Sequence, residues 1–93
     1  MIKWIYKPSG FCPVQAEGFF MGKYFYFRSR WSRATIEFAD SEEDWKLNNL
    51  LKRYIVFEDK APAAGWIPKW LAYVCIYRGL LLFLLKRKSH EEV

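Results

Sequence analysis

Residues 31–38 read WSRATIEF, and their order is typical of a β-strand with one buried face. Ala34, Ile36 and Phe38 fall on one side of an extended chain, because successive side chains of a strand point to opposite faces. The polar residues of the same stretch fall on the other side: Arg33, Thr35 and Glu37. The stretch therefore predicts a strand that turns its apolar side toward a core.

Three stretches that precede it are also typical of strands. Residues 2–6 and 14–20 are separated by the turn-like segment 7–10, KPSG. Residues 24–30, YFYFRSR, follow a turn at 21–23 and carry bulky rings that pack well on a pleated sheet. We therefore expect the N-terminal part of the chain to form a small antiparallel sheet of three to four strands.

The acidic run at residues 40–44, DSEED, is typical of a helix start. Asp40 or Ser41 can cap the exposed amides, and acidic side chains are stabilised at the positive end of the helix dipole. Apolar residues then recur at helical spacing: Leu47, Leu50, Leu51 and Tyr54. We expect one amphipathic helix that ends near Tyr54 and packs on the sheet.

Residues 70–85 are apolar apart from Arg78 and Gly79, and Pro68 suits the first position of a helix. We expect an apolar C-terminal helix, and a hairpin turning at Arg78-Gly79 is the alternative. The run is shorter than the roughly 20 residues that cross a bilayer, and an arginine near its middle is costly in lipid. A spanning helix is therefore disfavoured against burial on the sheet or against a second chain in a homodimer. Together these elements predict a single α+β domain over residues 1–93.

Aromatic residues make up 20% of the 93 residues, and the formal net charge is +5. A core this small does not hide so many rings, so some of them should lie on the surface and mark an interface. The positive charge favours an anionic partner, which is a nucleic acid, a membrane surface or an acidic protein. These totals point to binding without naming the partner.

Residues that serve catalysis are sparse. His90 is the only histidine and lies in a polar tail, while Cys12 and Cys75 have no CxxC pair or His/Cys cluster beside them. The carboxylates of residues 42–44 sit at a helix start and face water. We therefore expect no enzyme activity, no catalytic residue, no metal and no cofactor. Both cysteines are expected to be free thiols in a reducing compartment.

Rings and guanidinium groups alternate in residues 24–33, with Phe25 and Phe27 expected to face the core. The remaining side chains define an aromatic–basic patch: Tyr24, Tyr26, Arg28, Arg30, Trp31 and Arg33. Such a patch suits single-stranded nucleic acid, because bases stack on rings and phosphates pair with arginine. The same residue types dominate protein-binding hot spots. A sheet face covered by the helices is the third interpretation.

Two segments, CPVQAEG at 12–18 and FYFRSRW at 25–31, resemble a pattern in small uncharacterised proteins of bacteriophages and prophages. The GWIP step at 65–68 is also similar to that pattern. The resemblance carries no catalytic motif. It implies a small accessory protein made in a bacterial cytoplasm, and such proteins often bind and block a host factor, including CRISPR effectors and other defence nucleases.

We therefore expect a non-catalytic protein that inhibits a host macromolecular machine by stoichiometric binding through the aromatic–basic patch. Its partner would be a host protein or a ribonucleoprotein complex. One alternative is a single-stranded nucleic-acid binding module that uses the same patch. Another is a membrane-associated protein held by residues 70–85 and the basic residues 86–88, although a membrane partner is the less favoured one. Residues 1–10 lack the long apolar stretch of a signal peptide, so a cytoplasmic location is expected.

Overall fold

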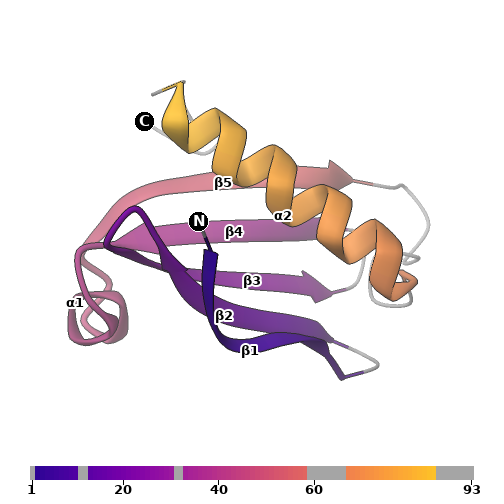
Figure 1. Cartoon of the computed structure of the whole chain (residues 1–93), viewed down its shortest axis with the longest axis horizontal. Helices are drawn as coiled ribbons and strands as arrows, with labels where there is room; N and C mark the ends of the chain where they lie inside the picture. Colours follow the sequence, from indigo (N-terminus) through magenta and orange to yellow (C-terminus); the bar gives the residue numbers. More distant parts are fainter. Residues whose placement is uncertain (1, 11–12, 31–32, 59–66, 86–93) are drawn as a thin grey trace.

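The strands form one antiparallel sheet in which each strand pairs with its neighbour along the chain. The computed structural model describes residues 2–10, 13–30, 33–58 and 67–85. The elements within these residues are β1 (Ile2–Ser9), β2 (Val14–Phe20), β3 (Lys23–Arg30), β4 (Arg33–Ala39), α1 (Glu42–Lys46), β5 (Leu50–Glu58) and α2 (Lys69–Leu84). The strand order is β1-β2-β3-β4-β5, and α2 crosses one face of the sheet diagonally (Figure 1).

The predicted fold, with a sheet of three to four strands, one amphipathic helix and a C-terminal helix, is wrong in two respects. The sheet has five strands in the described residues, and the segment expected to be the amphipathic helix forms the five-residue α1 followed by β5. Helix α1 stops because Asn48 adopts a left-handed conformation with φ of 62°, which does not continue a right-handed helix. From there Tyr54 and Val56 are buried, while Arg53 before them is exposed and Ile55 between them is half-buried, which is the two-residue period of a strand.

The core lies between α2 and the face of the sheet that α2 covers. Its strand residues are almost all apolar: Val14, Ala16, Phe25, Phe27, Ala34, Ile36, Phe38, Tyr54 and Val56. Phe38 stacks on Phe83 of α2 with the ring centroids 4.1 Å apart. The hydroxyl of Tyr54 donates to the backbone carbonyl of Leu82 at 3.4 Å. These contacts set the rotation of α2 on the sheet.

Helix α2 runs without interruption through Arg78 and Gly79, so the hairpin alternative is wrong. It begins after Pro68, which has an extended conformation at the N-cap. The helix approaches the sheet closely at Gly79, where an added Cβ would overlap Cγ2 of Ile36. Within the described ranges, no helix is long and apolar enough to cross a membrane.

Candidate binding surfaces

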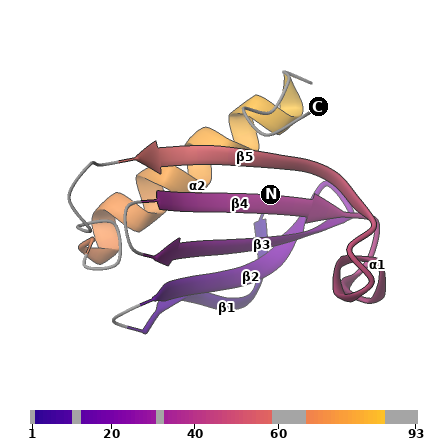
Figure 2. The same cartoon turned by 180° about the vertical axis from the view of Figure 1, so that it is seen from behind.

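The described residues of the aromatic–basic patch lie on the far face of the sheet, which is the face turned away from α2 (Figure 2). Tyr24 lies there but is fully buried, and its hydroxyl donates to Oε1 of Glu17 at 2.6 Å. Its ring contacts Phe19 and Trp45, with centroids 6.0 and 5.6 Å away. Tyr24 therefore has no surface to offer a partner, and its role is to join β2, β3 and α1.

Trp45 of α1 covers the middle of the patch. Its ring lies 4.6 Å from that of Tyr26, and its Nε1 donates to Oε1 of Glu37 at 2.7 Å. Ser41 caps the helix by accepting from the backbone N–H of Asp44, which places Trp45 over the sheet. Sequence reasoning missed Trp45 because it treated the acidic run only as a helix start. The signal available was a large ring one residue after the last acidic side chain of that run.

Of the arginines of the patch, one forms an ion pair and another bonds a tyrosine. Arg33 is exposed and forms an ion pair with Glu58 across β4 and β5 at 3.4 Å. Arg28 is half-buried and hydrogen-bonds Tyr26, while Glu37 accepts from Arg53 at 3.2 Å. The side chain of Arg30 and the whole of Trp31 lie outside the described residues.

The strands contain three acidic residues, and all three lie on the far face: Glu17, Glu37 and Glu58. They offset the positive charge of the arginines on that face, so the attraction for phosphates is weaker than the sequence alone predicts. Of the predicted site residues, the structure places Tyr24, Tyr26, Arg28 and Arg33 on this one face. Their binding role stays a prediction, with Tyr24 out of reach of a partner.

Two tyrosines beside Glu17 are held in the protonated form. Burial raises the pKa of Tyr24, and its hydrogen bond to the Glu17 carboxylate raises it further. Burial and Glu17 raise the pKa of Tyr6 in the same way. Neither hydroxyl ionises near neutral pH, so the cluster of Tyr6, Glu17 and Tyr24 connects β1, β2 and β3 through protonated tyrosines.

A second surface is formed by α2, which exposes large apolar residues on its outward side as well as burying apolar residues on its inward side. The buried residues of the helix are Ala72, Cys75, Ile76, Gly79 and Leu80. The outer stripe comprises six apolar residues: Trp70, Val74, Tyr77, Leu81, Leu84 and Leu85. Trp70 is 67% exposed and Leu81 is 55% exposed. The first five residues of the stripe recur at alternating intervals of four and three, so they form one line along the whole helix.

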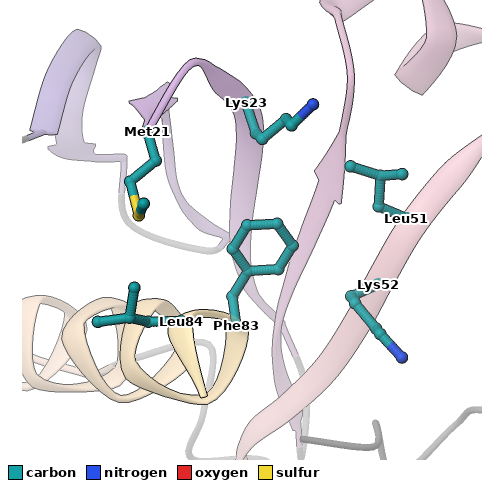
Figure 3. A pocket seen from close by; sticks show the side chains of 6 residues that line it. All are labelled: Met21, Lys23, Leu51, Lys52, Phe83 and Leu84. Carbon is teal, nitrogen blue, oxygen red and sulfur yellow. The ribbon is translucent and has the colours of Figure 1, made fainter. Parts of the chain in front are cut away.

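Two apolar grooves adjoin the outer stripe. One groove, of about 510 Å³, lies between α2 and the ends of β1 and β2, and it is lined by Ile2, Trp4, Phe20, Tyr77, Leu80, Leu81 and Leu84. The other, of about 500 Å³, lies at the C-terminal end of α2, where Met21, Leu51 and Leu84 surround Phe83, and Lys23 and Lys52 complete the lining (Figure 3). The stripe is therefore the crest of a broader apolar surface.

The charges around the outer stripe are basic. The only charged residues of α2 are Lys69 and Arg78, and both are exposed. Lys23 and Lys52 line the groove at the C-terminal end of the helix. Lys23 also binds Asp40 at 2.7 Å. The strand glutamates are all on the far face, so no acidic strand residue lies on the face that α2 covers.

The described residues contain no group of three or more His, Cys, Asp or Glu side chains placed to hold a metal ion. Cys75 is a free, buried thiol inside α2, and burial raises its pKa to about 11. No protein-family model matches this chain, and neither a curated protein nor a solved structure matches it.

Proposed function

We propose that this chain is a non-catalytic binding protein that docks on its partner through the outer stripe of α2. One observation carries the proposal, namely that a helix packed into the core also exposes a continuous apolar line of six residues on its other side. A helix that is apolar all round is normally buried all round. The stripe is therefore a surface that a partner covers.

The size of the stripe supports this interpretation. Six side chains that are each about half exposed present roughly 600 Å² of apolar surface. The largest apolar patch on a typical monomeric protein covers about 300–600 Å² and is often functional. The flanking grooves extend the same surface beyond the stripe.

The aromatic–basic patch is less well suited to bind a partner than the outer stripe is. Its tyrosines contact Trp45, and Glu58 forms an ion pair with Arg33. Single-stranded nucleic acid needs free ring faces and unmatched cations, so we favour docking through α2 over a nucleic-acid module. Docking through α2 could inhibit a host machine, such as a defence nuclease in a phage-infected bacterium, and this inhibition stays a prediction.

The experiment uses charge insertion on the stripe with a matched control. Val74→Glu with Leu81→Glu places two charges in the centre of the stripe, where the side chains are about half exposed. Ile5→Glu with Leu47→Glu makes the same charge change at exposed apolar positions off the stripe. The tagged proteins are expressed in bacteria, and each gently prepared lysate is separated by sedimentation.

Wild type and the control are expected to sediment ahead of the 11.2-kDa monomer, and the stripe variant is expected to return to the monomer position. Circular dichroism of the purified variants establishes that both are folded. A folded stripe variant that sediments with wild type would overturn the proposal. So would a wild-type protein that sediments only as a monomer.

A further inference from the structure

We propose that the partner of the outer stripe is an anionic lipid surface, on which α2 lies parallel to the membrane plane. This inference rests on the proposed function, because it names the partner of the same surface. It concerns attachment to one side of a bilayer. The sequence argument against a spanning helix therefore does not bear on it.

The shape of the molecule suits a flat surface. α2 forms an outer layer of its own on one side of the sheet (Figure 1), and the stripe extends from Trp70 to Leu85. At about 1.5 Å per residue this line is roughly 22 Å long. The inward side of the helix stays packed on the sheet, so the stripe can enter the boundary between headgroups and acyl chains while the fold remains intact. Interfacial helices bury their apolar side about 5–10 Å deep in that boundary.

The residue types of the stripe suit the same boundary. Trp70 and Tyr77 combine an apolar ring with a polar group, and such rings are enriched where lipid meets water. Val74, Leu81 and Leu84 supply purely apolar surface between and beyond them. The groove beside β1 adds the half-buried Ile2 and Trp4 next to the stripe.

The charges beside the stripe favour an anionic partner. Lys69 and Arg78 flank the stripe along the helix, Lys52 borders it at the C-terminal end, and α2 itself has no acidic residue. Each basic residue held near an anionic bilayer raises the affinity of the protein for that bilayer roughly fivefold. The apolar outer stripe matches the acyl-chain region of a negatively charged lipid surface, and the basic residues beside it match the headgroups.

A second copy of this chain is a weaker match. Two stripes would bury roughly 1,200 Å² together, which reaches the lower end of a stable interface. However, Arg78 lies near the middle of α2 and would meet its own copy in an antiparallel pair. Like charges brought together in this way oppose association. The homodimer is therefore an outcome for the test to detect.

The test is cosedimentation of the purified full chain with vesicles of phosphatidylcholine alone or of phosphatidylcholine mixed with phosphatidylserine. We expect binding to the mixed vesicles, at least tenfold weaker binding to the neutral ones, and weakening with added salt. Val74→Glu with Leu81→Glu should abolish binding, and Ile5→Glu with Leu47→Glu should leave it unchanged.

A second pair of variants tests the basic border. Lys69→Gln with Arg78→Gln should weaken binding to the mixed vesicles by roughly 25-fold, because two cations are lost. Lys7→Gln with Lys46→Gln makes the same charge change away from α2 and should have a small effect. Equal binding to neutral and mixed vesicles would overturn the inference, as would equal losses in the two lysine-containing pairs.

The outcomes also separate this inference from the proposed function. In one outcome, the wild type does not bind vesicles but forms a dimer or binds a protein, and the stripe variant loses that association. This result would overturn the lipid inference and leave docking through α2 intact. A wild type that ignores vesicles and is also a monomer in the lysate sedimentation would overturn both.

Discussion

Replacement of Gly79 by Ala tests the contact that sets which side of α2 faces outward. The substitution favours the helix intrinsically by about 1 kcal/mol, since glycine is a poor helix former. In this structure the new Cβ would overlap Cγ2 of Ile36, which is fully buried and β-branched and so has few rotamers to choose from. Overpacking of this kind costs about 1–3 kcal/mol.

The cost should lie at the upper end of that range. Relief by shifting the helix would disturb the stacking of Phe38 on Phe83 and the hydrogen bond from Tyr54 to Leu82. We therefore expect Gly79→Ala to destabilise the protein by about 2 kcal/mol net of the helix gain. For a chain of this size that lowers the melting temperature by about 10 °C.

The assay is thermal and urea unfolding followed by circular dichroism, with Ile36→Ala as the second arm of a double-mutant cycle. In the Ile36→Ala background the overlap is gone, so Gly79→Ala should be neutral or stabilising there. The coupling between the two positions should thus be at least about 2 kcal/mol. A Gly79→Ala protein that is more stable than wild type would refute the close approach of α2 to β4.

Three further predictions concern the groups beneath the surface. Because the folded state holds Tyr24 protonated, the free energy of unfolding should fall above about pH 10, where the unfolded chain releases a proton that the folded chain keeps. Tyr24→Phe should flatten this alkaline fall and cost about 1–2 kcal/mol at pH 7 in urea unfolding; an unchanged alkaline limb would count against the bond to Glu17. With Cys12 replaced by Ala, Cys75 should react with a disulfide reagent at pH 8 about 100-fold more slowly than a free thiol, because its pKa is raised to about 11; a rate near that of a free thiol would contradict its burial. Ser41→Ala should cost about 1 kcal/mol of stability through loss of the N-cap bond from Asp44, and no loss would mean that α1 does not depend on its cap.

The strands of the N-terminal half could be predicted because their side chains alternate. The alternation in residues 33–38 corresponds to β4, where Ala34, Ile36 and Phe38 are fully buried. The segment after α1 could not be assigned in this way. Leu47, Leu50, Leu51 and Tyr54 fit a helical spacing, and only Asn48 and the β-prone run 54–57 argued for a break and a strand.

The candidate sites were predictable only in part. The period of two correctly put Tyr24, Tyr26 and Arg28 on one face of β3. Their surroundings depend on residues distant in the chain, such as Trp45 from α1, and no local pattern reveals those. For α2 the sequence indicated an apolar helix but not its outward side, because a helix that is apolar all round has no preferred direction. Burial at Gly79 and Ala72 sets the direction, since small residues allow the closest approach.

The most direct test of docking through α2 is the accessibility of one stripe residue inside cells. In a chain whose Cys12 and Cys75 are both replaced by Ala, Leu81→Cys reports on the stripe and Thr35→Cys reports on the far face. A membrane-permeant maleimide is applied to cells that make each variant and to the dilute purified proteins. We predict that labelling at position 81 is at least tenfold slower in cells than in the purified protein, while labelling at position 35 differs little between the two. Equal labelling of position 81 in both settings would contradict the account.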